Sequence, residues 1–415
     1  MIMKLVSTMR LKNLNLLIIQ FAALLFLTTC GEGSSPNEVA AQSDDDEYQD
    51  DTAADGTAGA TVEEEPPSQT AANIGDNEPL LLSNTYQLVT DGLRSGEGYF
   101  SADGSKFIYQ SEVPGDNPFY QIYLRDLTTG VTSKISPGIG LTTCSWVHPT
   151  MDRVIFASTH EDPDAIKKQA DEISMRESGE VRAYAWDYDL HYDIYQSDLL
   201  GERIVNLTNS PGYDAEGSYS SDGNKILFAS NREAYQRTLS LAEQRLFEDD
   251  NSYFMDLYIM DADGSNLQQL TFSPGYDGGP FFSADNQKIV WRRFNPDGNS
   301  AEIWTMDVDG TNQRQLTAEA RVSWGPYFHP SGDYIIYSSN VLGNSNFELF
   351  IVDLEGQHQP VRVTNTEGTD ILPVFSPDGT QLAWSSTRTS DQSSQIFMAD
   401  WNDQRARAML GLGNL

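Results

Sequence analysis

The pattern of apolar and polar positions repeats six times along the chain. Each repeat has two short apolar runs with a four-residue turn between them, and runs of this length predict β-strands. The six stretches align without gaps and begin at Phe100, Val147, Tyr219, Phe282, Phe328 and Phe375. Turn residues such as Asp103 and Gly104 suit a tight reversal, because aspartate bonds its own backbone and glycine accepts a positive φ. Each repeat therefore predicts a β-hairpin.

Two more strands follow most hairpins. Segments such as "DLYIMDADG" and "ELFIVDLEG" predict a third strand and a turn, and "LQQLT" and "VRVT" predict a fourth strand. Four short strands in a unit of roughly 45 residues are the signature of a propeller blade. The last unit lacks its fourth strand, and "YQLVT" at residues 86–90 matches the missing pattern. We predict an all-β fold, a six-bladed β-propeller closed by pairing this N-terminal strand with residues 395–401, which hides both edges.

These repeats resemble the WD-like propeller repeats of TolB, the periplasmic component of the Tol/Pal system, over about residues 86–402. The turns "FSPDG" and "FSADG" with their "LxT" strands carry the resemblance. TolB-like lipoproteins and peptidase-linked propellers are more similar still, through "GYDAEGSYS", "GYDGGPFFS", "FHPSG" and "FELFIVD". The resemblance implies a TolB-like fold in a protein of the cell envelope. In those peptidases a zinc aminopeptidase domain follows the propeller, and we expect none here.

The first 30 residues predict an export signal. Lys4, Arg10 and Lys12 precede an apolar run at residues 14–27, which is too short and wrongly flanked for a stable membrane span. The following "LTTC" resembles the lipobox of bacterial lipoproteins, and this implies acylation of Cys30 and a lipid anchor. Gly31 favours the outer membrane, with the protein facing the periplasm or the cell surface. A plain signal peptide with an incidental cysteine is the alternative.

Composition sets the remaining boundaries. Residues 31–85 carry fourteen acidic side chains and no Lys or Arg, which predicts a disordered acidic linker. The propeller then spans residues 86–402, and residues 403–415 form a C-terminal tail. The net charge of -35 repels phosphate backbones, so nucleic acid is not an expected partner. With Cys30 acylated, Cys144 has no disulfide partner, and its apolar surroundings predict a core residue.

The candidate site lies where the chain enters the first strands. Six residues before the Ser or His of each hairpin turn, three blades place Asp and three place Ser or Thr, and all six are expected to line one mouth of the central channel. Second strands end on the same face, where one blade has two arginines. The insertion at residues 159–192 is expected to bring in His160, Glu161 and Trp186. The candidate ligand-binding residues are Asp214, Glu216, Asp277, Asp370, Arg292, Arg293, His160 and Glu161. The alternatives are salt bridges that staple neighbouring blades and insertions that only decorate the rim.

Enzyme motifs do not appear in the chain. G-x-S-x-G, H-E-x-x-H and C-x-x-C are absent, and too few histidines are available for a three-histidine metal site. Asp214, Asp277 and Asp370 remain possible ligands for Ca²⁺. We therefore predict a monomeric binding or scaffolding protein of the cell envelope with a protein, peptide or glycan ligand. The alternative is a Ca²⁺- or Mn²⁺-dependent hydrolase or lyase that uses carboxylates at the channel mouth.

Overall fold

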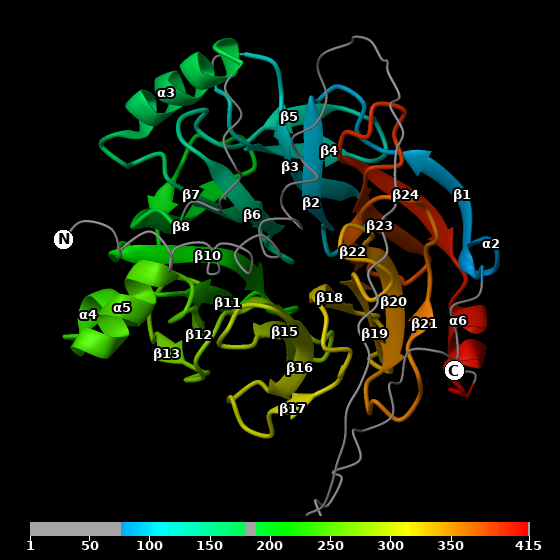
Figure 1. Cartoon of the computed structure of the whole chain (residues 1–415). Coiled ribbons are helices and arrows are strands. Elements are labelled where there is room, and N and C mark those ends of the chain that lie inside the picture. The colour runs from blue at the N-terminus through cyan, green and yellow to red at the C-terminus, as the bar shows by residue number, and fades with distance from the viewer. Residues whose placement is uncertain (1–75, 116, 180–187, 414–415) are drawn as a thin grey trace, which may run out of the picture.

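The computed structural model describes residues 76–115, 117–179 and 188–413, and strands dominate this part of the chain. Figure 1 shows short sheets arranged radially around a common centre. The predicted signal peptide, Cys30 and the linker up to residue 75 lie outside the described residues. The structure therefore tests the propeller itself and the last ten residues of the predicted linker.

The strands recur in units of four, counted from the centre outward. First strands are β2 (Arg94–Phe100), β6 (Thr142–Val147), β10 (Gly212–Tyr219), β14 (Asp277–Phe282), β18 (Ser323–Phe328) and β22 (Asp370–Phe375). Second strands are β3 (Lys106–Glu112), β7 (Arg153–Ser158), β11 (Lys225–Ser230), β15 (Lys288–Phe294), β19 (Tyr334–Ser339) and β23 (Gln381–Ser386). Third strands are β4 (Gln121–Asp126), β8 (His191–Asp198), β12 (Asp256–Asp261), β16 (Ala301–Asp307), β20 (Glu348–Asp353) and β24 (Gln395–Trp401). Fourth strands are β5 (Thr132–Lys134), β9 (Val205–Asn206), β13 (Gln268–Gln269), β17 (Arg314–Gln315), β21 (Val361–Arg362) and β1 (Leu82–Gln87).

Hydrogen bonding joins these strands into five sheets, four with four strands and one with eight. The eight-stranded sheet contains β6–β9 and β10–β13, which are joined where β8 pairs in parallel with β10 over only two residue pairs. Each first strand contacts the first strand of the following unit, and β22 contacts β2. The contacts therefore run around a closed circle, and the fold is an all-β propeller.

The chain is closed by its N-terminal strand, as the sequence predicts. β1 pairs antiparallel with β24, with Tyr86 opposite Met398 and Gln87 opposite Phe397. The Leu88 amide then donates to the Ile396 carbonyl at 2.8 Å. Figure 1 shows β1, in blue, beside β24, in red. The two ends of the propeller thus share one sheet.

Both ends of this sheet contain more structure than predicted. The predicted linker ends earlier, because residues 78–81 form helix α2 (Glu78–Leu81) and β1 begins at Leu82. The predicted C-terminal tail contains helix α6 (Asp403–Met409). Leu81 and Leu82 join Ala406 and Leu410 in one buried cluster with aromatic residues of the last two units. Burial of this apolar surface orders segments whose overall composition is polar.

The hairpin turns owe their shape to one hydrogen bond that recurs. In turns with the sequence Ser-x-Asp, the serine hydroxyl donates to the aspartate, as Ser101 does to Asp103 at 2.6 Å. The same serine oxygen accepts the Lys106 amide across the turn at 2.9 Å. The hydrogen bond from Ser101, followed by those from Ser105, lowers the pKa of Asp103 to about 2. In two units a histidine replaces the serine, and the Nδ1 of His148 accepts the Met151 amide at 3.1 Å.

A second recurring hydrogen bond explains the "LxT" pattern. The threonine that follows the fourth strand donates to an acidic residue at the start of the third strand, as Thr364 does to Glu348 at 2.6 Å. Its hydroxyl also accepts the amide of the next third-strand residue, Leu349, at 2.9 Å. The same pairs recur as Ser136 with Gln121, Thr208 with Asp193, Thr271 with Asp256, and Thr317 with Glu302. Each threonine therefore fixes the outer edge of its unit.

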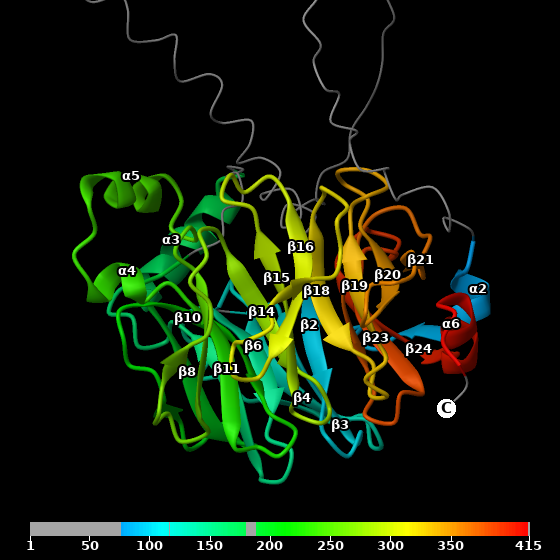
Figure 2. The same cartoon turned by 90° about the horizontal axis from the view of Figure 1, so that it is seen from below.

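The two long insertions form short helices at the edge of the ring. Helices α3 (Ala165–Glu177), α4 (Glu233–Gln236) and α5 (Leu241–Asp249) lie to one side of the strands in Figures 1 and 2. No residue of α5 is buried. The prediction that both insertions roof the channel is therefore wrong for these helices. They occupy the rim, which is the alternative that the sequence left open.

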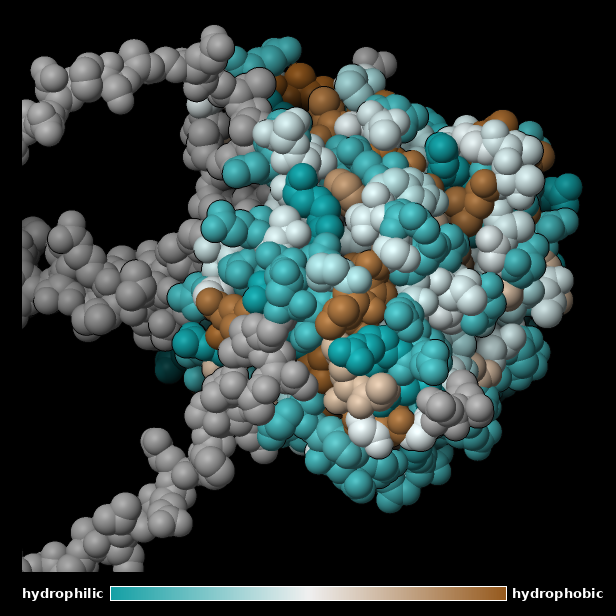
Figure 3. All heavy atoms as spheres, turned by 90° about the vertical axis from the view of Figure 1, so that its right-hand side faces the viewer, coloured by the Kyte–Doolittle hydropathy of each residue, from teal (hydrophilic) through white to brown (hydrophobic). Residues whose placement is uncertain are grey.

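The described surface is that of a polar protein. Among the described residues, no helix has the length and apolar character that a membrane span requires. Figure 3, which faces the side formed by β1 and α6, shows mostly hydrophilic residues with scattered apolar ones. Single exposed apolar side chains are normal on a protein surface.

Candidate functional site

The three predicted carboxylates are buried in ion pairs. Each lies near the start of a first strand and binds an arginine at the end of, or just after, the second strand of the same unit. The pairs are Asp214 with Arg232, Asp277 with Arg293, and Asp370 with Arg388. In the second pair, Nε and Nη2 of Arg293 donate to the two Asp277 oxygens at 2.7 Å each. The arginines satisfy these carboxylates, so the prediction that they serve as open ligand-binding groups is wrong.

Because of these ion pairs, the three aspartates do not form the predicted metal site. A shared Ca²⁺ site needs oxygen atoms from several residues around one point. Each of the three aspartates instead has its own arginine. These three pairs act within a unit, whereas the ion pair of Arg292 in β15 with Glu216 in β10 joins two neighbouring units, as the stapling alternative predicts.

His160 and Glu161 lie away from the centre. The His160 ring packs on Tyr195 with centroids 4.2 Å apart, and the Tyr195 hydroxyl donates to Glu161 at 3.0 Å. Asn206, on the outermost strand of that unit, donates to the same carboxylate oxygen at 3.4 Å. The prediction that these two side chains approach the channel is therefore wrong. Trp186 lies outside the described residues.

A kink in every first strand determines which side chains face the centre. Each first strand pairs with its second strand through a register shift at the same place. One residue there has a positive φ, between +37° and +59°. The six residues are Glu97, Cys144, Glu216, Gly279, Gly325 and Leu372. They lie two positions after the residues that the sequence analysis predicts at the channel mouth. A bulge adds one residue to a strand and changes the direction of its side chain, so these residues face the axis.

Hydrogen bonds link four of these bulges to the preceding unit. The Glu97 amide donates to Ser385 of the preceding unit at 3.1 Å, and the Cys144 amide donates to Gln110 at 3.3 Å. The Gly279 amide donates to the carboxylate of Glu216 at 2.7 Å. Side chains of one unit thus hold the backbone of the next unit around the axis.

Glu216 and Arg292 form the centre of this ring. Nη2 of Arg292 donates to Glu216 Oε1 at 2.7 Å, and the Tyr276 hydroxyl donates to the same oxygen at 2.9 Å. The guanidinium carbon of Arg292 lies 4.0 Å from the centre of the Trp324 ring and 4.6 Å from that of Tyr276. A Cβ on Gly279 would lie 2.5 Å from Nη1 of Arg292. The glycines of "GYDGGP" therefore make room for the arginine, and "GYDAEG" supplies its carboxylate partner.

Glu97 and Cys144 complete what we call the axial cluster, which consists of Glu97, Cys144, Glu216, Arg292, Tyr276 and Trp324. The thiol of Cys144 lies 3.5 Å from Glu97 Oε2, and the Tyr99 hydroxyl donates to Oε1 at 3.1 Å. Desolvation, followed by the charge of Glu216, raises the pKa of Glu97 to about 7. Burial raises the pKa of the Cys144 thiol as well, so Cys144 is a protonated, buried residue, as the sequence predicts.

Aromatic rings close the axis on one side of the cluster. Tyr99, Trp146, Phe281 and Tyr327 lie two positions after the bulges of four units. The ring centroids of Tyr99 and Trp146 are 4.5 Å apart, and those of Phe281 and Tyr327 are 5.3 Å apart. We call these four residues the aromatic floor. They fill the axis with rings, so the axial cluster lies above a floor and not in an open tunnel.

Comparison with known proteins agrees with this architecture. Residues 246–414 match the family model described as the TolB beta propeller domain. This part of the propeller thus resembles a TolB propeller domain. A protein described as a TolB from Agrobacterium tumefaciens is 17% identical with a TM-score of 0.50, and the match covers 74% of this chain and 90% of that one.

Other solved structures are similar at lower scores. TolB from Acinetobacter baumannii is 20% identical with a TM-score of 0.45, and the match covers 66% of this chain and 54% of that chain. An oligogalacturonate lyase from Vibrio parahaemolyticus is 13% identical with a TM-score of 0.47, and the match covers 77% of this chain and 94% of that chain. At these identities the likeness concerns the fold alone.

Outside the axial cluster, one group of side chains has the arrangement of metal ligands. Asp162, Asp189 and His191 bring one ligand atom each to within 4.8 Å of one another, and this is the only such group among the described residues. Nζ of Lys168 lies 3.0 Å from Asp162 and also contacts Asp189. The ammonium group of Lys168 thus provides the positive charge between these two carboxylates.

The residue patterns predicted Glu216 and Arg292, which the structure places in the axial cluster, but not Glu97 or the aromatic floor. Strict alternation of side chains fixes which residues face the centre, and a bulge resets that alternation. Four of the six bulged residues are not glycines, so composition gave no sign of a positive φ. The one available signal was the equivalence of Glu97 to Glu216 in the repeat alignment, because both stand two residues after a predicted mouth residue.

Proposed function

We propose that this protein is an exported, lipid-anchored binding protein of the cell envelope, built on a six-bladed propeller, that docks a protein or peptide ligand over the axial cluster. The observation that carries the proposal is a ring of polar side chains, contributed by several units, above a floor of aromatic rings. Convergent polar groups beside aromatic surface are typical of binding sites.

The strand pattern supports the proposed blade count of six. The eight-stranded sheet contains two complete four-stranded meanders, and its parallel junction spans only two residue pairs. We count these meanders as separate blades, because the six first strands contact one another in sequence around the circle. The predicted domain covers residues 86–402. On this count, the propeller begins earlier, at Leu82, and α2 and α6 flank it.

Export and anchoring form the second part of the proposal. The basic segment, apolar run and "LTTC" at residues 27–30 support a lipoprotein signal, with acylation at Cys30 and placement in the outer membrane. Labelling cells with an alkyne-tagged fatty acid is expected to mark the wild-type protein and not Cys30→Ser. The Cys30→Ser variant is expected to move from the membrane fraction to the soluble fraction. Equal labelling of both proteins would contradict the lipid anchor.

Crosslinking tests the binding role. A photoreactive amino acid at Leu93, an exposed residue just before β2, samples the face of the axial cluster, and one at Ser221 samples a hairpin turn on the opposite face. We expect a discrete crosslinked partner from Leu93 and none from Ser221. The partner, once purified, must bind the wild-type chain in solution. Identical products from both positions would contradict an axial docking site.

The metal-dependent hydrolase or lyase lacks support at its proposed ligands. Asp214, Asp277 and Asp370 are bound by arginines, so a metal would have to displace three buried ion pairs. Titration with Ca²⁺ or Mn²⁺ is expected to leave the melting temperature unchanged. A large stabilisation that Asp277→Ala abolishes would restore the enzyme hypothesis.

A further inference from the structure

Glu97 is the one acidic group of the axial cluster that lacks a cationic partner. Among the described residues no Lys, Arg or His forms an ion pair with it, whereas Glu216 is paired with Arg292. Its two oxygens contact only the Tyr99 hydroxyl and the Cys144 thiol. A half-buried carboxylate without a counter-charge is unfavourable in a folded protein. When Glu97 is ionised, the axial cluster therefore carries an excess negative charge.

A second group in the cluster also lacks a partner. Arg292 is 2% exposed, and its Nε–H has no hydrogen-bond acceptor among the described residues. Buried polar groups are nearly always satisfied, and exceptions often mark functional sites. The cluster thus lacks a cation at Glu97 and an acceptor at Arg292. A peptide ammonium group can supply the cation at Glu97, whereas the Arg292 Nε–H is itself buried.

The arrangement does not suit a metal ion. Glu97, Cys144 and Glu216 are not among the described groups that bring three ligand atoms within 4.8 Å of one another. Ca²⁺ takes six to eight oxygen ligands, and this cluster offers a single unpaired carboxylate. An ammonium group needs only one carboxylate and gains further from aromatic faces, which the aromatic floor provides. The acidic excess of the whole chain, with 61 acidic against 26 basic residues, would attract such a cation over a longer range.

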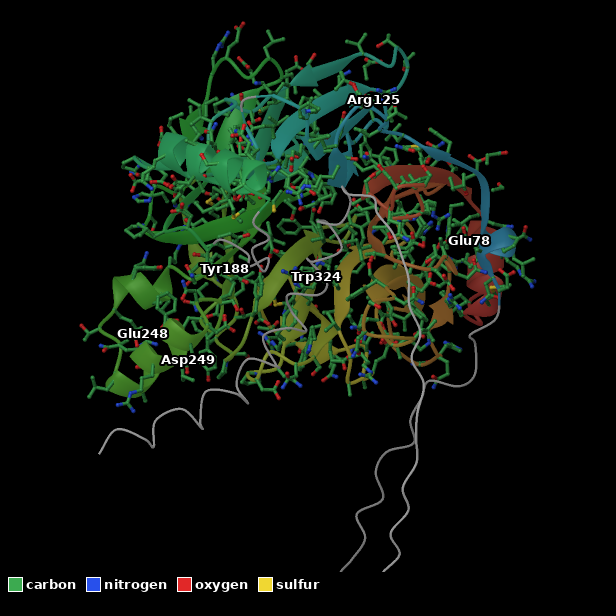
Figure 4. All side chains as sticks on the ribbon, turned by 45° about the horizontal axis from the view of Figure 1, so that its top comes forward. Glu78, Arg125, Tyr188, Glu248, Asp249 and Trp324 are labelled. Carbon is green, nitrogen blue, oxygen red and sulfur yellow. The ribbon has the colours of Figure 1, made fainter. Side chains whose placement is uncertain are left out.

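We propose that Glu97 binds a primary ammonium group of a peptide, either an N-terminus or a lysine side chain, above the aromatic floor. This inference rests on the proposed binding function and names the chemistry of its ligand. Figure 4 shows Trp324 of the cluster, together with Tyr188, close to the middle of the ring. Tyr188 packs on Tyr276 with centroids 6.2 Å apart and so borders the same site.

The affinity for an ammonium peptide is expected to depend on pH. Without a bound cation the pKa of Glu97 is about 7, so its carboxyl is mostly neutral at pH 6 and mostly ionised at pH 8. The groups that face it are Tyr99, the Cys144 thiol, Glu216 and Arg292; the pKa is raised for Tyr99 and Cys144 by burial and for Arg292, despite burial, by the charge of Glu216, so these three groups keep their charge states in this window. A lysine ammonium stays protonated throughout. Its affinity should therefore rise by about tenfold from pH 6 to pH 8.

Calorimetry with three synthetic peptides tests the proposal. Trialanine offers an N-terminal ammonium, N-acetyl-Ala-Lys-Ala-amide offers a lysine ammonium, and N-acetyl-trialanine-amide offers neither. We expect one or both of the first two to bind and the third to bind at least tenfold more weakly. The two ammonium peptides distinguish the source of the cation. Equal affinity for all three peptides, or no binding by either ammonium peptide, would overturn the proposal.

Matched variants separate this site from general electrostatics. Glu97→Gln keeps the shape of the side chain and should weaken ammonium binding at least tenfold and abolish its rise with pH. Glu355→Gln removes the same charge from an exposed residue and should change neither. Glu97→Asp serves as a second variant if Glu97→Gln does not fold, with weakened binding and a retained rise with pH. Unchanged affinity in folded Glu97→Gln would refute this role for Glu97. A partner crosslinked at Leu93 would still support the binding function in that case.

Discussion

At the scale of single residues, buried hydroxyl groups hold the outer edges of the blades. Thr364 is fully buried and serves two groups at once, the Glu348 carboxylate and the Leu349 amide. Glu348 is itself fully buried, so loss of the hydroxyl would remove the partner of its Oε2 and of the Leu349 amide, although Oε1 would keep its ion pair with Arg362. An unsatisfied buried polar group costs more than the net value of the hydrogen bond itself.

Thr364→Val is therefore expected to lower the free energy of unfolding by about 1–3 kcal/mol. Urea denaturation of the two proteins measures the difference. Thr128→Val is the control, because Thr128 is exposed in a turn and its side chain forms none of the threonine contacts described above. A change below about 0.5 kcal/mol in Thr364→Val would show that water replaces the hydroxyl.

Asp256 makes the stability depend on pH. Burial, followed by the charge of Asp277, raises the pKa of Asp256 to about 8. Its unfolded pKa is near 3.9, so between pH 4 and pH 8 the folded state binds more protons than the unfolded state. The contribution of Asp256 to stability is thus complete below about pH 4 and is lost as the pH rises to about 8.

Asp256→Asn removes this titration. Relative to the wild type, the variant is expected to gain stability steadily from pH 5 to pH 8, by on the order of 1 kcal/mol per pH unit. Urea midpoints at several pH values provide the measurement. Asp91→Asn, at an exposed position, is the control for the loss of one negative charge. Parallel curves for the wild type and Asp256→Asn would show that Asp256 is not protonated in the folded protein.

At the scale of elements, the bulge in each first strand is the feature that organises the axis. The hairpins could be predicted from sequence, since alternation and Ser-x-Asp turns are local signals. The bulges at Glu97, Cys144 and Glu216 could not, because a positive φ at a non-glycine residue is imposed by the neighbouring blades. The sequence analysis therefore predicts Asp214 at the channel mouth, whereas the structure places it in a buried ion pair.

Gly279→Ala tests the packing of one bulge. The glycine has a φ of +59°, and a Cβ there would lie 2.5 Å from Nη1 of Arg292. Gly332→Ala is the matched control, with a φ of +78° and nothing within 4 Å of the new Cβ. Both variants should lose about 1 kcal/mol from backbone strain. Gly279→Ala should lose more, because Arg292 must move away from Glu216. Equal melting temperatures for the two variants would contradict close packing at this bulge.

At the scale of the whole molecule, the closed ring substitutes for covalent crosslinks. Cys144 is the only cysteine in the described part of the chain, so no disulfide joins the units there. The first and last segments meet instead in the sheet of β1 and β24. Closure could be predicted because the last repeat lacks a strand that the N-terminus supplies. The additional burial of Leu81 could not, because the acidic composition around it predicts disorder.

Two truncations distinguish the linker from the closing strand. Removal of residues 31–75 is expected to leave the melting temperature unchanged, whereas removal of residues 31–90 deletes α2 and β1 and exposes an edge of β24. Burying Leu81 and Leu82 alone is worth about 1.5–3 kcal/mol each, and an unpaired strand edge promotes association. The longer truncation should therefore melt earlier and form oligomers in light-scattering measurements. A synthetic peptide of residues 76–90 should restore the melting temperature by pairing with β24. If both truncations melt like the full chain, the ring does not depend on its N-terminal strand.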